Sequence, residues 1–501
     1  MSTALEDLAR DIDATCEARD VSALHAHLES ISALNCAALS LVERGILAFY
    51  EANIHAALRA EADSASSGWV EPLLEDEIRA LRVARHALAA ETTQTLGTDL
   101  KLRVITNLAN CLDRCGRVVE AVELWDEALS EHPHFGMAMG NRGLALYWYA
   151  RYAGTGQEQV LLLRTSYRTL VAALRAGVEP HAREQLKNLV AQLRSRADWD
   201  EVEVSWHPFK CGRSKQERLY RRWCVQHRAV LNSINDVELG VDALQDTLTL
   251  PSITVAASEA TALMPRPYAI FNQLKQEYAS ARYMVFEALG EKGGKLHFAD
   301  KGVLLFDAMD YRFYRTWIEK LKMAFLALHA IFDKIAYLVN EYWRVGLEPK
   351  RVSFASVWRS TDRASSELSA RFSTSSNWPL RGLYGLSRDF HLKPVGEGAV
   401  DPEARVLNDI RNHIAHKYLR VHDHFLYDAE KDRARNKDQL GYAVSGQELE
   451  HHVMKLLKLA RSGLIGLSCA VLHEEAEKRS KIGDEGNFPM MLSVLEDRFR
   501  L

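Results

Sequence analysis

The chain has 501 residues, more than one ordinary domain holds, so we expect two or three domains. Hydrophobic residues make up 47% and charged residues 26%, the balance of a soluble globular protein, and no stretch approaches the roughly 20 uncharged residues that a membrane span needs. The first residues lack the basic start of a secretion signal, and seven scattered cysteines show no disulfide pattern, so we expect a cytoplasmic protein without membrane partners.

The net charge of −4 is unevenly distributed along the chain. Residues 1–100 carry 17 Asp and Glu against seven Arg and no Lys, a balance of −10, so by difference from −4 the remaining residues carry about +6. Opposite charges in two parts of one chain indicate different partners for each part. A solvated acidic helix face would give the same pattern, and this alternative stays open.

Residues 1–200 are predicted to be helical, because apolar residues recur there at intervals of three and four. A 34-residue unit that starts at Leu102 has the pattern of a tetratricopeptide repeat (TPR), which is a helix, a turn with a small residue, a second helix and a closing proline. Its key positions are Leu108, Ala109, Leu112, Gly116, Ala121, Trp125, Ala128 and Pro133.

A second, degenerate unit follows at residues 141–176. Single repeats cannot bury their own faces, so we expect divergent repeats before residue 100 as well. Stacked repeats form a concave surface, and we expect this TPR-like domain (residues 1–200) to bind a protein or peptide ligand there. A scaffold without a ligand is the alternative.

Residues 201–265 are predicted to form a basic and aromatic connector with some strand character, because 202–206 and 247–250 alternate between apolar and polar residues. Residues 206–228 contain seven Lys and Arg against one Glu, interleaved with four aromatic residues. Basic side chains bind phosphates and aromatic rings stack on bases, so this composition favours RNA contact. The candidate residues are Lys210, Arg213, Lys215, Arg218, Arg221 and Arg222. Packing of the connector against the acidic N-terminal part is the alternative.

Residues 266–485 are predicted to form a helical bundle, followed by a tail at 486–501, so the predicted fold class is all-α. The expected helices are 271–289, 313–342, 359–371, 404–419 and 445–478, with a long loop at 372–401. Ser445 and Glu448 have the spacing of a capping box at the start of the last helix.

The sequence Arg-Asn-His-Ile-Ala-His at residues 411–416 resembles the signature of the HEPN superfamily (higher eukaryotes and prokaryotes nucleotide-binding). That signature is an Arg, four to six further residues and a His, often with a polar residue directly after the Arg. Residues 277–283 and 332–336 look like the first two helices of the family's bundle. The resemblance implies a metal-independent RNA endonuclease whose products are a 2′,3′-cyclic phosphate and a 5′-hydroxyl.

The residue types suit this chemistry. Without a metal, the substrate's own 2′-hydroxyl attacks the phosphate, and a histidine can move the proton near neutral pH. His416 would be this acid and base, while Arg411 would grip the phosphate and stabilise its developing charge. Asn412 lies four residues before His416 and could orient it. His413 and Asp333 are possible supporting residues.

Five residues on an ideal helix turn through about 140°, so Arg411 and His416 cannot both face one phosphate from a straight helix. Either the helix distorts near Ala415, or two facing motifs form one site. HEPN active sites look composite in this way, and the chain has one motif, so the resemblance implies a homodimer.

We expect no metal and no cofactor, because the histidines at 413, 416, 422 and 424 lack a cysteine or carboxylate at suitable spacing. The preferred function is an RNA endonuclease regulated by the TPR-like domain, and the resemblance suggests antiphage defence or toxin-type growth arrest in bacteria. The alternative is a non-catalytic HEPN module for dimerisation or protein interaction, joined to a TPR scaffold.

Overall fold

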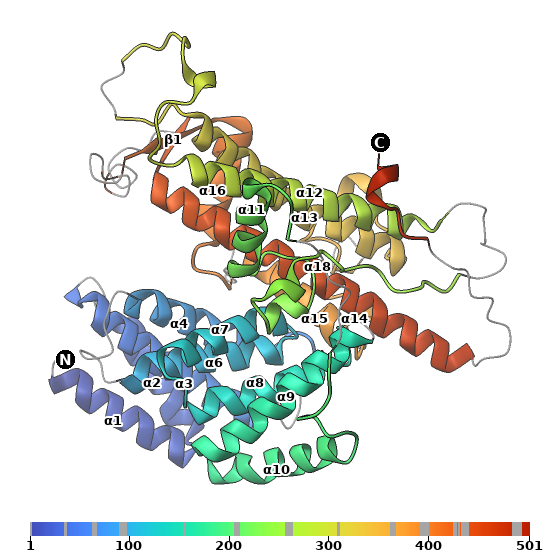
Figure 1. The fold of residues 1–501 in the computed structure, drawn as a ribbon. Helices are drawn as coiled ribbons and strands as arrows, with labels where there is room; N and C mark the ends of the chain where they lie inside the picture. The colour runs from blue at the N-terminus through green and yellow to red at the C-terminus, as the bar shows by residue number, and fades with distance from the viewer. Residues whose placement is uncertain are drawn as a thin grey trace.

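The chain forms an N-terminal helical array and a C-terminal helical bundle, which pack against each other (Figure 1). The computed structural model describes residues 3–34, 38–62, 68–89, 98–153, 156–204, 211–255, 264–307, 311–360, 367–390, 400–423, 428, 431, 440–482 and 493–500. The strands in these ranges form one two-stranded sheet, so the protein is all-α, as predicted.

The array is built from antiparallel helix pairs, of which α3–α4, α6–α7 and α8–α9 have the closest packing. Its helices are α1 (Thr3–Ala18), α2 (Val21–Ala33), α3 (Leu41–Ala62), α4 (Pro72–Leu88), α6 (Thr98–Arg114), α7 (Val118–Glu131), α8 (Gly136–Tyr149), α9 (Gln157–Ala176) and α10 (Pro180–Arg194). Ala109, Ala121 and Trp125 are buried where α6 meets α7, and Gly116 turns the chain between them with a φ of 87°. The helical array is therefore observed, whereas its assignment as TPR repeats stays a prediction.

The prediction of strand character between 201 and 265 is wrong for the described residues. Residues 202–204 and 247–250 form no strand, and the segment contains α11 (Lys215–Gln226) and two short 3-10 helices instead. An alternating sequence forms a strand only where a neighbouring strand supplies the ladder of hydrogen bonds. Here the amide of Leu248 donates to Leu231 within the same connector, which fills the space between the array and the bundle.

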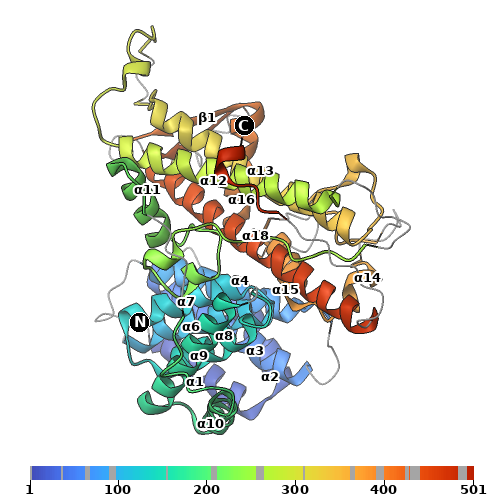
Figure 2. The ribbon, with the colours of Figure 1, turned by 45° about the vertical axis from the view of Figure 1, so that its right-hand side comes forward.

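Three long helices form the core of the bundle, and α18 runs beside both the array and the other bundle helices (Figure 2). The bundle helices are α12 (Arg266–Glu291), α13 (Thr316–Tyr342), α14 (Ala370–Ser373), α15 (Trp378–Phe390), α16 (Ala404–His416) and α18 (Gly446–Ile482). The capping box at the start of α18 is confirmed, because the amide of Glu448 donates to Ser445 Oγ and the amide of Ser445 donates to Glu448 Oε2.

Two predictions in the bundle are wrong. The described part of 359–371 is helical only at the short α14, and α15 lies inside the segment predicted to be a loop. Helix α15 contains Pro379, Gly382 and Gly385, which weaken a helix. Its glycines allow it to pack closely on the array. A Cβ on Gly382 would lie 2.2 Å from the carbonyl oxygen of Gly116, so only glycine permits this approach.

A short parallel sheet follows α16 and was also missed by the sequence analysis. It pairs β1 (Tyr418–His422) with β2 (Gly441–Ser445), with Tyr418 opposite Gly441 and His422 opposite Ser445. The amide of Phe313 donates to the carbonyl of Val421, which joins the segment before α13 to β1. The sheet therefore fixes the chain directly after His416.

Helices α13 and α18 are long and apolar enough to cross a membrane by composition alone. In the structure, 50% and 78% of their apolar windows are buried inside the molecule. Internal packing thus accounts for most of the apolar window of α18 and for half of that of α13.

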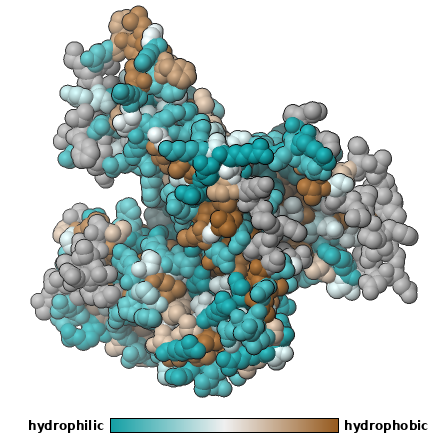
Figure 3. Space-filling view, in the orientation of Figure 1, coloured by the Kyte–Doolittle hydropathy of each residue, from teal (hydrophilic) through white to brown (hydrophobic). Residues whose placement is uncertain are grey.

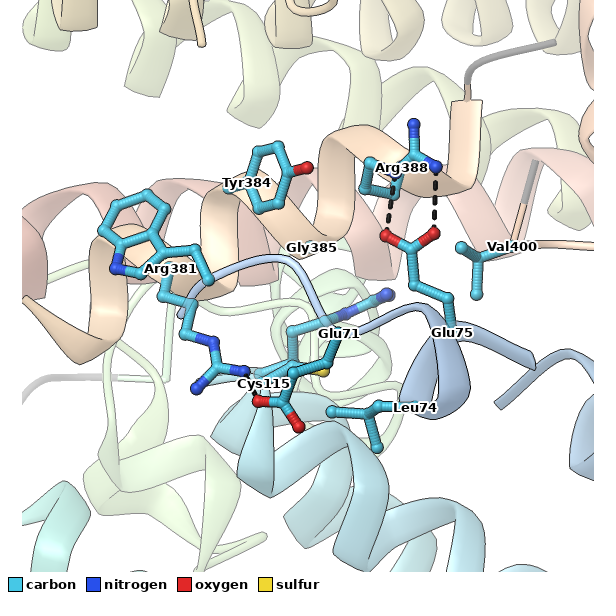
Figure 4. A pocket seen from close by; sticks show the side chains of 11 residues that line it. Glu71, Leu74, Glu75, Cys115, Arg381, Tyr384, Gly385, Arg388 and Val400 are labelled. Atoms are coloured by element: carbon cyan, nitrogen blue, oxygen red, sulfur yellow. Dashed lines mark hydrogen bonds and ion pairs between the residues drawn. The ribbon is translucent and has the colours of Figure 1, made fainter. Parts of the chain in front are cut away.

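The junction between the array and the bundle is held by ion pairs. Arg388 of α15 makes two hydrogen bonds with Glu75 of α4, at 2.8 and 2.9 Å, and Arg381 pairs with Glu71 (Figure 4). Lys458 of α18 pairs with Glu123 of α7. Acidic residues of the array therefore meet basic residues of the bundle, and part of the uneven charge distribution is satisfied inside the chain.

Asp389 is the most deeply buried charge of this junction, at 1% exposure. Arg82 of α4 donates to both of its oxygens, at 2.7 and 2.9 Å, and Arg117 donates to Oδ2 at 2.7 Å. Burial raises the pKa of the Asp389 carboxyl, but Arg117 and Arg82 lower it more, so its pKa lies well below the ordinary value. Asp389 is therefore charged and structural.

Candidate active site on helix α16

Helix α16 is held to the bundle by one face. Ala404, Leu407, Ile410 and His413 recur every three residues and are all buried. This spacing defines one face of a helix, and Val406 and Ile414 pack against the same core from its edges. Asn412 and His416 are exposed and Arg411 is half-buried, so the three candidate catalytic side chains lie on the outer side of an anchored helix.

The guanidinium of Arg411 donates through Nη1 to Asn412 Oδ1 at 2.9 Å. Asn412 thus orients Arg411 in this structure, and its predicted orientation of His416 stays a prediction. Arg411 also influences His329 of α13, a residue that the sequence analysis missed. Burial lowers the pKa of His329, nearby Asp333 opposes this shift, and the charge of Arg411 lowers it further. His329 is therefore a neutral imidazole beside Arg411.

His416 is the last residue of α16 and is exposed to solvent. Its imidazole makes no hydrogen bond or ion pair with any residue in the described ranges. The side chain is thus free to meet a ligand from outside the chain.

The helix is regular through the whole motif, because residues 404–416 are α-helical without a break at Ala415. Of the two explanations given above for the angle of about 140° between Arg411 and His416, helix distortion therefore fails. A single chain presents the two side chains in different directions.

The two possible supporting residues have structural contacts. The ring of His413 is buried, its Nδ1 lies 2.7 Å from the carbonyl oxygen of Asp409, and it stacks on Tyr442 of β2. Asp333 accepts a hydrogen bond from the amide of Phe354 at 3.0 Å. These contacts hold α16 and the loop after α13 in place, and a catalytic part for either residue stays a prediction.

Two further residues near His416 were not found from the sequence. Tyr418 begins β1 and is 44% exposed, and the guanidinium of Arg312 lies over its ring at 5.2 Å from the centroid. An exposed aromatic ring with a cation on it is the kind of surface on which a nucleic-acid base stacks. Tyr418 could have been found from the sequence, because Lys417 and Tyr418 directly follow the motif. Arg312 could not, because it lies more than 100 residues earlier in the chain.

The basic cluster of the connector is only partly free. Lys210 lies outside the described residues, whereas Arg213, Lys215, Arg218 and Arg222 are exposed and Arg221 pairs with Glu217. The interleaved aromatic rings are used inside the chain, because Tyr220 and Trp223 pack on Phe286 of α12. Arg228 pairs with Asp126 of α7, as the alternative of packing on the acidic part predicts.

Comparison with known proteins gives one match. Residues 258–475 match the model of a family described as LA2681-like HEPN. No curated protein and no solved structure matches the chain. The matched segment contains α12, α13, α15 and α16 entirely and most of α18, so it includes every candidate catalytic residue. The resemblance of the C-terminal bundle to HEPN domains is therefore supported by the family match, over residues 258–475.

Proposed function

We propose that the protein is an RNA endonuclease of the HEPN type, which cleaves by attack of the substrate's 2′-hydroxyl and needs no catalytic metal. The observation that carries this proposal is the placement of Arg411, Asn412 and His416 on the outer side of a helix whose opposite face is buried in a HEPN-like bundle. Phosphodiester cleavage requires a fixed cation and a histidine that can move a proton, and this helix exposes both.

In this mechanism His416 takes the proton from the 2′-hydroxyl, whose oxygen bonds to phosphorus, and passes a proton to the 5′-oxygen as the bond between phosphorus and that oxygen breaks. Arg411 stabilises the charge that builds up on the phosphate oxygens, and the hydrogen bond that it donates to Asn412 Oδ1 restricts its guanidinium. Tyr418 offers a stacking surface for a base beside the cleaved bond.

The active unit in this proposal is a homodimer. Arg411 and His416 diverge on an unbroken helix, so one phosphate can meet both types of side chain only if two copies of α16 face each other. A symmetric pair would place two Arg and two His around one cleft. This also explains why the single chain contains only half of the chemistry.

The chain between α12 and α13 carries exposed apolar side chains at Leu304 and Phe306, and we call this segment the hydrophobic arm. It offers a surface for the second copy. Leu304 and Phe306 are 91% and 93% exposed, and Figure 3 shows hydrophobic surface at the tip of the upper projection. The chain after the arm is bonded to β1, which follows α16, through the amide of Phe313. Large exposed apolar residues in a chain whose site is incomplete favour another copy of the same chain as their partner.

Replacing this apolar surface should break the dimer. We expect the double variant Leu304→Asp, Phe306→Asp to be folded but monomeric at micromolar concentration, and to lose cleavage together with dimerisation. Light scattering and an RNA cleavage assay measure the two properties. Val241→Asp changes another exposed apolar residue and should alter neither. A wild-type chain that is monomeric throughout would contradict the composite site.

We further propose that the array controls cleavage as a sensor of a protein or peptide signal in the cytoplasm. Asp389 is bonded to Arg82 and Arg117 of the array, and the next residue, Phe390, packs on His329 beside Arg411. A shift of the array therefore reaches the site through two adjacent residues. Uncontrolled cleavage of tRNA, mRNA or rRNA would stop growth, which fits antiphage defence or a toxin.

The rival function is a non-catalytic module for dimerisation or protein interaction. Residues 401–440 contain eight Lys and Arg against eight Asp and Glu, so the motif's own surroundings do not attract RNA. RNA affinity would then have to come from the exposed arginines of α11 or from a dimer cleft.

Cleavage of RNA in EDTA separates the two functions. We expect wild-type protein to cut RNA to fragments with 2′,3′-cyclic phosphate ends, and Arg411→Ala or His416→Ala to reduce the rate by at least about 100-fold. Arg405→Ala, which removes another exposed arginine from the same helix, is the matched control and should keep the activity. Equal rates in all four proteins, or cleavage that EDTA abolishes, would contradict the proposal.

A further inference from the structure

Three metal-ligating side chains meet at the opposite end of α16 from His416. Glu403 directly precedes α16, and His451 and His452 lie in the second turn of α18. One potential ligand atom from each residue lies within 4.8 Å of those from the other two. Glu403 is eight residues before Arg411, about 12 Å along the helix, so the cluster is separate from the proposed RNA site.

The geometry of the Glu403–His451 pair fits a shared metal ion. Glu403 Oε1 lies 3.4 Å from His451 Nε2. Two ligands bonded to one tetrahedral Zn²⁺ at about 2.0–2.1 Å lie about 3.3 Å apart. The other carboxylate oxygen of Glu403 is bonded to Lys455, which also bonds Asp401, so the lysine has a second partner and Oε1 remains available.

His452 supplies an independent indication of a ligand. It is 3% exposed, and its Nδ1 is buried without a hydrogen-bond partner among the described residues. An unpaired buried nitrogen costs free energy unless something satisfies it. A bound metal ion is a partner that satisfies a buried histidine nitrogen of this kind.

We propose that Glu403, His451 and His452 bind a divalent transition-metal ion of the Zn²⁺ class, with water completing the coordination. Two imidazoles and one carboxylate are a ligand set that zinc accepts readily. The ion would tie the start of α16 to α18 and thereby stiffen the helix that carries Arg411 and His416. This site is structural and does not rest on the proposed RNA cleavage.

The chain contains a matched control for this proposal. His473 and Glu477 lie on the same helix α18, with Nε2 and Oε1 also 3.4 Å apart, but no third metal ligand joins them among the described residues. His473→Ala therefore removes a histidine–glutamate pair of equal separation without touching the proposed site. His451 is largely exposed, so His451→Ala should remove a ligand without disturbing the core.

The test measures Zn²⁺ binding to the full, untagged chain after chelator treatment, by competition with a chromophoric chelator. We expect one tight Zn²⁺ per chain, affinity at least about tenfold weaker in His451→Ala and in Glu403→Gln, and wild-type affinity in His473→Ala. Zn²⁺ should also raise the melting temperature of wild type and of His473→Ala, but not of His451→Ala. Absence of tight binding by wild type, or an equal loss in both histidine variants, would overturn the proposal, and neither outcome depends on RNA cleavage.

Discussion

The arginines of the junction and the arginine of α16 have opposite surroundings. Arg82 and Arg117 are buried and both donate to the carboxylate of Asp389, and Arg117 also pairs with Glu120. In the described part of the chain Arg411 bonds only the neutral amide of Asn412, and exposed His416 lies five residues further along the same helix. The charges of the junction are neutralised by the protein itself, whereas those of α16 are not.

This difference separates structural charges from functional ones. A buried guanidinium needs a carboxylate partner, because a lone buried charge costs several kcal/mol. A half-exposed guanidinium can remain without one, and it is then available to a phosphate. By this criterion the junction holds the array on the bundle, and α16 is prepared for a ligand that comes from outside.

Removing the central carboxylate of the junction should have the largest effect on stability. Asp389→Asn leaves two buried guanidiniums around a neutral amide, so we expect the free energy of unfolding to fall by about 3–5 kcal/mol. Urea denaturation measures it. Glu127→Gln, which breaks the exposed pair with Arg85, is the control and should cost less than about 1 kcal/mol. Equal costs for both variants would remove the distinction between the two regions.

The stability that Asp389 contributes should depend on pH, and the direction of this dependence follows from its pKa. The pKa of Asp389 is lowered in the folded protein, so its ionisation stabilises the fold above the unfolded-state pKa of about 3.9 and ceases to do so as pH falls through the folded-state value. The stability gap between wild type and Asp389→Asn should therefore be constant from about pH 8 to 5 and shrink below about pH 4. A gap that grows on acidification would contradict the assignment.

A smaller loss of stability should follow when α15 is pushed away from the array by a substitution that leaves the charges of the junction unchanged. The Cβ of Gly382→Ala would lie 2.2 Å from the carbonyl oxygen of Gly116, so α15 must move away from the array. We expect a loss of about 1–3 kcal/mol in urea denaturation. At Gly385, on the same helix, the nearest atoms to a Cβ lie at 3.7 Å, so Gly385→Ala should be neutral or slightly stabilising. Equal destabilisation by both would contradict the close approach.

The long helices could be predicted from the sequence because their apolar residues recur at helical spacing over many turns. Helices α12, α13 and α18 were expected at nearly their observed positions, and so was the cap at Ser445. Helix α15 was missed because its two glycines and Pro379 argue against a helix locally, and only the close contact with Gly116 explains them. The sheet depends on pairing with a strand about 20 residues away, which local sequence does not reveal.

The candidate site was predicted in part for a similar reason. Arg411, Asn412 and His416 lie close together in the sequence, so they form a recognisable motif. The structure places them on the outer side of one helix. His329 and Arg312 come from distant segments, and only the fold brings His329 near Arg411 and Arg312 onto Tyr418. The separate cluster of Glu403, His451 and His452 also depends on the fold. The charge asymmetry was visible, but its partners at the junction were not.

Complementation between two inactive variants tests the central claim, that each chain carries half of the site. Arg411→Ala retains His416, and His416→Ala retains Arg411, so a mixed dimer contains one complete set of the two side chains across the cleft. We expect each variant alone to be inactive in RNA cleavage and the mixture, after denaturation and refolding together, to recover a substantial part of the wild-type rate. A mixture that forms mixed dimers yet stays as inactive as its parents would show that each chain must supply both residues itself, and would contradict the account.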